Sequence, residues 1–181
     1  KPIIYQSIPD DGFFEEIKTK LDSFGFETWT EEQKFMILSD KNNISPNPQI
    51  TVKKLNQWKN EFGTEIFEKS VEPWEIDVVK KALQNKNTLF FIAFYNENPV
   101  GMSYVHVADD VCRVDYLLVS AEYRKMGIGR TLINAFVEYC KENKILLCYL
   151  WPDGKSAEKI YYEAGFRNFV TKLAGRAKYM Q

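Results

Sequence analysis

"EYRKMGIGRTL", residues Glu122–Leu132, places Gly127 and Gly129 directly after the basic pair Arg124 and Lys125. A strand-like run, "RVDYLLVS", precedes it, and apolar residues at helical spacing follow it. The first N–H groups of a helix have no partner within the helix, and the helix dipole is positive there. Glycine lets a bulky anion approach the backbone. This strand-to-helix turn is therefore predicted to bind a phosphate-bearing ligand; a tight turn with exposed basic side chains is the open alternative.

The segments on either side of the turn predict a right-handed βαβ crossover. Residues 127–142 carry a continuous apolar stripe at helical spacing. Residues 144–151 contain "ILLCYLW", apolar on both faces like a buried parallel strand, and residues 111–119 form the strand before the turn. We therefore expect an α/β (α+β) protein with a mixed central sheet of about six to seven strands and flanking helices.

The strand at residues 111–119 has an unusual polar face. Strict alternation puts Cys112, Val114, Tyr116 and Leu118 on one apolar face. Arg113 and Asp115 then share the other face with Val111, Leu117 and Val119. Charge in the middle of a strand needs a reason, and a ligand cleft is one.

The rest of the chain predicts a main domain at residues 48–181 and an N-terminal extension at 1–45. The polar, proline-containing "DKNNISPNPQ" reads as the linker between them. The extension is predicted to have a helix at 13–24 and two short strands, "GFETW" and "KFMIL". In the main domain we expect a strand at "QITV", a helical face from Leu55 to Ile66, a helix opened by Pro73, and a hairpin of "TLFFIAFY" with "VGMSYVHV". A short helix capped by Ser156 and ended by Gly165, then two strands around Ala174-Gly175, complete the prediction.

Composition excludes several classes of protein. The net charge of −1 argues against a broad nucleic-acid surface. The longest apolar runs are too short to cross a bilayer, and the start lacks the apolar core of a secretory signal. Cys112, Cys140 and Cys148 have no metal-ligand spacing and are an odd count, so we expect reduced core residues of a cytoplasmic protein. We expect no metal.

Two familiar phosphate motifs do not fit the turn. No Lys-Ser or Lys-Thr follows a Gly-x4-Gly pattern, so it is not a Walker loop. A dinucleotide fingerprint needs a third glycine where Leu132 stands, and an acidic residue at the end of the next strand, which instead ends in Leu150-Trp151.

The turn resembles the acetyl-CoA signature of GNAT N-acetyltransferases. "RKMGIG" matches Arg/Gln-x-x-Gly-x-Gly/Ala after a strand ending in Leu117-Leu118-Val119. "AEKIYYEAGF", residues 157–166, resembles the family's Ala-x-x-x-Tyr-x-x-x-Gly-Phe. With the strand order, the resemblance covers roughly residues 48–181. It implies an acetyl-CoA-dependent N-acetyltransferase, an acyltransferase of EC 2.3.1 type, acting by direct transfer.

The resemblance also implies roles for particular residues. The loop would bind the pyrophosphate of CoA through backbone N–H groups, and the strand end would pair with the pantetheine arm. The family's asparagine, seven residues before the motif tyrosine, is replaced here by Gly154, and Asp153 is the candidate substitute. The expected cofactor-binding residues are Leu117, Leu118, Val119, Arg124, Lys125, Met126, Gly127, Ile128, Gly129, Arg130 and Asp153.

Acetyl transfer to an amine needs a base and an acid. Tyr161 matches the family's tyrosine acid, which protonates the CoA sulfur, whereas the adjacent Tyr162 should point elsewhere. Asp115 is the first choice as base, directly or through water; His106, water alone, and a purely structural Asp115–Arg113 salt bridge stay open.

Two functions remain from the sequence. The first is an N-acetyltransferase acting on a primary amine of a small molecule or peptide, with neither nucleic acid nor membrane as partner. Its acceptor side is expected at residues 50–87, which contain Trp58, Phe62, Phe67 and Trp74. The second is a non-catalytic module that senses acyl-CoA. Residues 1–45 would pack on the domain, cover the cleft, or form a homodimer.

Overall fold

The computed structural model describes residues 5–9, 12–40, 42–55 and 73–180. These residues belong to two compact units. The larger unit spans residues 36–167, and the smaller unit combines residues 1–35 with 168–181.

The sheet of the larger unit is mostly antiparallel. Its strands follow the spatial order β2, β7, β6, β5, β4, β3. Their bounds are Phe26–Leu38 for β2, of which only the end belongs to this unit, Ile50–Leu55 for β3, Thr88–Tyr95 for β4, Asn98–Ala108 for β5, Val111–Val119 for β6 and Leu147–Leu150 for β7. The hairpin of β4 and β5 is as predicted, and both strands are buried over most of their length.

The predicted crossover is confirmed. Helix α4, Ile128–Glu142, connects β6 to β7, and these two strands pair in parallel, with Val111 opposite Leu147 and Arg113 opposite Tyr149. The apolar stripe of α4 is buried as its spacing indicated. The mixed α/β fold class is therefore confirmed.

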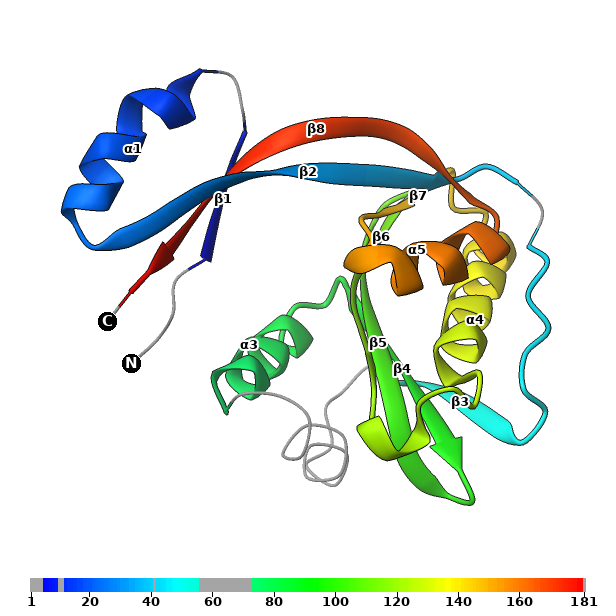
Figure 1. The fold of residues 1–181 in the computed structure, drawn as a ribbon. Coiled ribbons are helices and arrows are strands. Elements are labelled where there is room, and N and C mark those ends of the chain that lie inside the picture. The colour runs from blue at the N-terminus through cyan, green and yellow to red at the C-terminus, as the bar shows by residue number, and fades with distance from the viewer. Residues whose placement is uncertain (1–4, 10–11, 41, 56–72, 181) are drawn as a thin grey trace. The chain divides into compact units, whose positions relative to one another are not determined.

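Helices cover both faces of this sheet, as Figure 1 shows. Helix α3, Pro73–Leu83, lies on one face, and α4 with α5, Gly154–Glu163, lies on the other. The core under α4 and α5 includes Phe91, Val114, Leu132, Phe136 and Phe166. The core under α3 includes Val79, Phe90, Ile92, Met102 and Tyr104. The two faces therefore have separate cores.

Two predicted boundaries in the larger unit are wrong. Leu55 does not begin a helix; it ends β3, where it pairs with Phe90 and packs into the α3-side core. Ser156 does not cap α5, which begins at Gly154, where the backbone adopts a φ of +80° that glycine tolerates best. Gly165 ends α5 as predicted, with a φ of +96°.

The predicted aromatic cluster of the acceptor side is only partly covered by the structure. Trp58, Phe62 and Phe67 lie outside the described residues, as does most of the helix predicted up to Ile66. Trp74 belongs to α3, but its side chain also lies outside what the structure describes.

The smaller unit contains β1, Tyr5–Pro9, helix α1, Phe13–Ser23, most of β2 and most of β8, Phe166–Tyr179. Helix α1 is as predicted. The two short strands predicted at "GFETW" and "KFMIL" are wrong, because this segment forms one long strand, β2. The two strands predicted around Ala174-Gly175 are wrong for the same reason, since β8 is one long strand. Ala174-Gly175 is not a turn: both residues pair with β1, and a Cβ at Gly175 would overlap the ring of Phe14. Glycine there admits a close approach of α1 to the strand.

The three cysteines meet in the crossover. Cys112 on β6 and Cys148 on β7 are opposite each other, and Cys140 lies on α4; all three are buried free thiols. Hydrogen bonds with Cys112 and Cys148, together with burial, raise the pKa of Cys140, so it stays protonated. The three cysteines therefore act as small apolar core residues.

Candidate active site

The glycine loop, residues 124–130, sits between β6 and α4. After β6 the chain forms a 3-10 turn at Ala121–Tyr123, and Gly127 is the N-cap of α4 with a left-handed φ of +78°. No side chain caps this helix, and its first turn carries no acidic residue. The first N–H groups of α4 therefore lack a built-in carboxylate partner, which suits an anionic ligand.

The basic side chains of the loop are in two different situations. Arg124 and Lys125 are exposed, and the Arg124 Nε donates to the Val119 carbonyl at 3.5 Å. Arg130 instead forms a two-pronged ion pair with Glu163 of α5, its Nη2 lying 3.0 Å from Oε1. The hydrogen bond from Arg130 lowers the pKa of Glu163. Arg130 thus ties α4 to α5, and the positive charge of the loop comes mainly from Arg124 and Lys125.

Strand β6 separates from β7 before it reaches the loop. The two strands pair only over Val111–Arg113, whereas β6 runs on to Val119 and β7 ends at Leu150. Leu117 and Val119 pack on the side of α4, and Leu118 on the side of α3. Main-chain groups on this half of β6 can therefore pair with an extended ligand.

Tyr161 is buried within α5. Its side chain is 5% exposed, and its ring meets Phe166 edge-on with centroids 6.1 Å apart. Burial, and then the negative charge of Asp153, raise the pKa of Tyr161 to about 12. Tyr162 is 40% exposed, with the Arg167 guanidinium over its ring, so the two neighbours point in different directions as expected. Tyr161 is a neutral phenol at physiological pH.

Asp115 lies at a β-bulge. Tyr104 of β5 pairs with Tyr116, but the next residue, Val105, pairs with Val114, so Asp115 is the extra residue of β6. The predicted strict alternation along β6 is therefore wrong. Cys112 and Val114 pack into the α4-side core, whereas Tyr116 and Leu118 pack into the α3-side core. The bulge is what reverses the faces.

The Asp115 carboxylate is surrounded by donors. Its Oδ1 accepts from Arg113 Nη2 at 2.9 Å, and its Oδ2 from His106 Nε2 at 3.2 Å. Burial first, and then the charge of Asp115 and a hydrogen bond to it, raise the pKa of Tyr104. Arg113 also lies over the ring of Trp151, 5.1 Å from its centroid. Asp115 is therefore an ion-paired carboxylate at the centre of a polar cluster.

His106 has both ring nitrogens engaged. Nε2 faces Asp115, and Nδ1 lies 3.0 Å from the hydroxyl of buried Thr88. Because a carboxylate only accepts, neutral His106 carries its proton on Nε2 and accepts from Thr88 through Nδ1. Sequence reasoning missed Thr88 and Tyr104, since only the register of β4, β5 and β6 brings them to this cluster.

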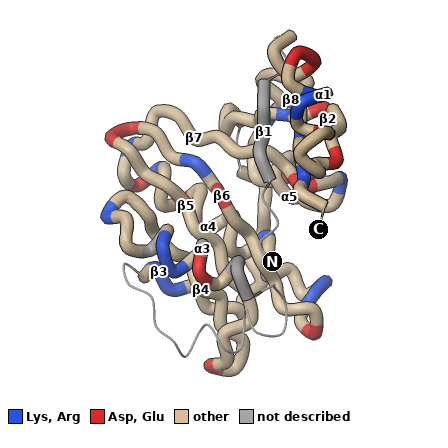
Figure 2. Tube along the Cα trace, turned by 90° about the vertical axis from the view of Figure 1, so that its left-hand side faces the viewer, with Lys and Arg blue, Asp and Glu red and all other residues tan. Residues whose placement is uncertain are grey.

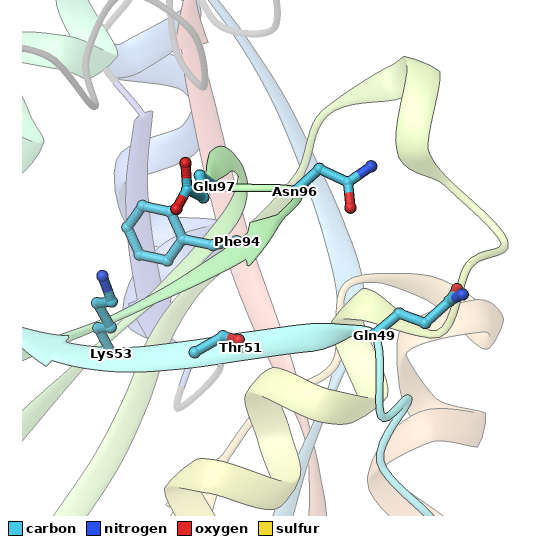
Figure 3. Close-up of a pocket in the computed structure, with 6 residues that line it drawn as sticks. All are labelled: Gln49, Thr51, Lys53, Phe94, Asn96 and Glu97. Carbon is cyan, nitrogen blue, oxygen red and sulfur yellow. The ribbon is translucent and has the colours of Figure 1, made fainter.

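A hollow of about 410 Å³ lies where β3 begins and β4 ends, next to the turn between β4 and β5. Figure 3 shows Lys53 and Thr51 on β3, with Phe94, Asn96 and Glu97 on β4 and the hairpin, and Gln49 beyond the start of β3. The Lys53 ammonium lies 4.8 Å from the centroid of the Phe94 ring. None of its lining residues is a predicted catalytic or cofactor-binding residue, although Thr51 and Lys53 fall within residues 50–87, where the acceptor side is expected.

The charges of the larger unit are dispersed. Figure 2 shows basic and acidic positions interspersed along its elements, with one basic stretch on β3. Within the part of the chain that the structure describes, no group of three or more His, Cys, Asp or Glu is placed to hold a metal ion. No helix of the described residues has both the length and the apolar character needed to cross a membrane.

Comparison with known proteins identifies a family and proteins of similar fold. The model of the "Acetyltransferase (GNAT) family" matches residues 52–166. A GCN5-related N-acetyltransferase from Sphaerobacter thermophilus superposes with a TM-score of 0.65 at 13% identity, over 99% of this chain and 60% of that protein's length. A GCN5-related N-acetyltransferase from Kribbella flavida superposes with a TM-score of 0.65 at 14% identity, over 98% of this chain and 68% of that protein's length.

A shorter structure is similar to the larger part of the chain. The ribosomal-protein-S18-alanine N-acetyltransferase from Escherichia coli gives a TM-score of 0.59 at 15% identity, over 73% of this chain and 95% of that one. At such low identities these likenesses show the fold. No curated protein matches the chain in sequence.

Proposed function

The chain belongs to the GNAT acetyltransferase family, and from this premise we propose that it transfers the acetyl group of acetyl-CoA directly to a primary amine of a small molecule or peptide. The observation that carries the proposal is the open N-terminus of α4, with Gly127 as its cap, beside a half of β6 that β7 does not pair. The division into residues 1–45 and a transferase domain of 48–181 remains a prediction.

The residues of the loop fit acetyl-CoA. Backbone N–H groups between Arg124 and Arg130 would hold the pyrophosphate, with Arg124 and Lys125 adding positive charge. Main-chain groups of Leu117–Val119 would pair with the pantetheine arm, and Asp153 stands next to the position of the family's asparagine. When bound, acetyl-CoA supplies an acetyl group activated as a thioester.

The protein's own groups would manage two protons. The acceptor ammonium must lose one, and Asp115 would take it through water, since Arg113 and His106 already occupy its oxygens. As the amine nitrogen bonds to the acetyl carbon and the carbon–sulfur bond breaks, Tyr161 would give its hydroxyl proton to the sulfur. Its pKa of about 12 keeps that proton in place until it is needed.

Two observations bear on the acceptor. The negative charge of Asp115 is largely balanced by Arg113, so this cluster offers hydrogen bonds more than a net charge to a cationic amine. The name of the E. coli neighbour makes it an enzyme acting on an alanine of a ribosomal protein, which supports including peptide amines among the candidate acceptors.

The test is CoA release measured with a thiol reagent, using polyamines, amino acids, aminoglycosides and amine-bearing peptides as acceptors, beside calorimetric titration with acetyl-CoA. Release with at least one amine supports the transferase. Binding of acetyl-CoA at one per chain without release across the panel would favour the acyl-CoA-sensing module. Absence of binding would overturn both readings.

A further inference from the structure

Asn47 connects the segment before β3 to both sides of Gly127. Its side-chain Nδ2 donates to the carbonyl of Met126 at 2.8 Å. Its backbone N–H donates to the Thr131 hydroxyl at 3.0 Å. That hydroxyl in turn donates to the carbonyl of Gly127 at 3.1 Å, and the same carbonyl accepts the Thr131 backbone N–H at 3.0 Å. The carbonyls immediately before and after the Gly127 N–Cα–C unit are thus both held by groups outside the loop backbone.

Holding these two carbonyls fixes the direction of two N–H groups. The structure describes no cis peptide bond. In a trans peptide the N–H points opposite to the C=O of the same unit. The Met126 carbonyl shares its peptide with the Gly127 N–H, and the Gly127 carbonyl shares its peptide with the Ile128 N–H. Turning both carbonyls toward Asn47 and Thr131 therefore turns both N–H groups away from these partners, so that they can donate to an anion.

The loop has a conformation that needs such support. Lys125 and Gly127 both have left-handed backbones, with φ of +68° and +78°. For lysine this region is sparsely populated, and it persists only where the surroundings enforce it. Asn47 holds the peptide between Met126 and Gly127, and it is itself fixed just before β3: its Oδ1 accepts from the Gln49 N–H at 2.9 Å, and its carbonyl from the Ile50 N–H at 3.0 Å.

We propose that Asn47, acting with Thr131, is a positioning residue that aims the N–H groups of the glycine loop at the phosphates of the cofactor. The proposal rests on the proposed function for the identity of the ligand. The preorganisation of the loop by Asn47 is a property of the free protein and can be measured without any ligand.

The chain offers a matched control in Asn42. Its Oδ1 accepts from the N–H two residues on, Ile44, as that of Asn47 does from Gln49. Its Nδ2 donates to Asn134 of α4 at 2.8 Å, well past the first turn of that helix. Asn42→Ala and Asn47→Ala therefore each remove one hydrogen bond to the N–H two residues on and one side-chain hydrogen bond to a distant residue. Only the bond lost in Asn47→Ala leads to the glycine loop.

The test combines hydrogen exchange in the free protein with calorimetry and kinetics. In Asn47→Ala we expect faster exchange of the Thr131 amide, which bonds the Gly127 carbonyl at 3.0 Å, a Kd for acetyl-CoA raised roughly fivefold to tenfold, a KM for acetyl-CoA raised alike, and an unchanged kcat. Asn42→Ala should match the wild type in all four. Thr131→Val loses the hydroxyl that links Asn47 to the Gly127 carbonyl but keeps the backbone bond to that carbonyl, so it should shift the same values in the same direction by a smaller factor. Thr131→Ser, which keeps the hydroxyl, should match the wild type.

Several results would overturn the proposal. Unchanged loop exchange and unchanged Kd in Asn47→Ala would do so, as would an equal effect of Asn42→Ala, which would mean that the segment only supports the fold. If Asn47→Ala does not fold, the Thr131 pair decides, and equal behaviour of Val and Ser there rejects the network. If the wild type does not bind acetyl-CoA, the proposed function fails, while the exchange rates still decide the role of Asn47.

Discussion

The two faces of the large unit's sheet are organised differently around the same strand, β6. On the face with α4 and α5, most candidate cofactor residues come from one continuous stretch, 117–130, and Asp153 and Tyr161 follow at the cap of α5 and within it. On the face with α3, the polar cluster collects side chains from β4, β5 and β6, and a bulge sets its geometry. The first face depends on local sequence, the second on strand register. Each variant below affects one face and should leave the other unchanged.

The largest effect is expected at Tyr161 on the α4–α5 face. Tyr161→Phe keeps the ring contact with Phe166 but removes the proton that the leaving sulfur needs. We expect kcat to fall roughly 10²- to 10⁴-fold, the range of general acid catalysis, with little change in acetyl-CoA affinity. Steady-state kinetics and calorimetry measure the two quantities.

Tyr162→Phe is the matched control, since Tyr162 is adjacent but half-exposed. It should change kcat by no more than about twofold, as surface substitutions usually do. Equal losses in the two variants would mean that the family motif is misaligned on α5.

The next effect is expected on the α3 face. Asp115→Asn removes the charge that accepts from Arg113 and His106, and with it the proposed base. We expect kcat/KM for the acceptor to fall about 10²-fold and the rise of rate with pH to be lost, while the Kd for acetyl-CoA stays within about twofold.

Asp110→Asn, an exposed carboxylate in the turn between β5 and β6, controls for the lost charge. A pH profile of Asp115→Asn that overlays the wild type would instead assign proton removal to water or to His106, and would leave Asp115 a structural member of its ion pair.

A smaller effect is expected at the cap of α4. Gly127→Ala puts a Cβ on a left-handed backbone, which costs about 1–2 kcal/mol and favours a shift of the loop. Space is not the problem, since that Cβ would lie 3.8 Å from the Asn47 Cβ. We expect the Kd for acetyl-CoA to rise roughly tenfold.

Gly12→Ala has the same backbone strain, at a φ of +92° with nothing within 4 Å, but lies in the smaller unit. Both variants should lose similar stability in urea, and only Gly127→Ala should lose affinity. Equal affinities would show that the left-handed cap does not serve the ligand.

The smallest effect is a pH dependence of stability. Because burial raises the pKa of Tyr161 to about 12 from an ordinary value of 10.0, the folded protein keeps a proton that the unfolded chain releases. This contribution is complete below about pH 10 and is lost as the pH rises to about 12. The wild type should therefore lose up to about 2 kcal/mol more stability than Tyr161→Phe over that window, by urea unfolding. Parallel curves would contradict the shifted pKa.

The contrast between the faces also explains what the sequence could predict. The crossover, the glycine loop and the divergence of Tyr161 from Tyr162 follow from helical spacing and short motifs, and the structure agrees. The faces of β6 do not, because alternation is counted along the strand and one extra residue at Asp115 reverses everything after it. Nothing in "VCRVDYLLV" marks the bulge; only the register with β5 reveals it.

A similar limit applies to the smaller unit. The sequence predicts a break between two strands at Ala174-Gly175, because glycine usually interrupts strands. In the structure it stays extended and makes room for Phe14, a residue far away in the sequence. The ambiguity between a turn glycine and a close-packing glycine is resolved by a tertiary contact, which local composition does not encode.

The three buried thiols of the crossover allow its local opening to be followed by their chemical reactivity. Cys112, Cys140 and Cys148 lie on β6, α4 and β7, one on each element of the platform that carries the glycine loop. A thiolate must be exposed to react with an alkylating agent. The rate of alkylation under native conditions therefore reports how often these three elements open. A ligand that binds the closed state slows this rate, so its binding can be measured without knowing the acceptor.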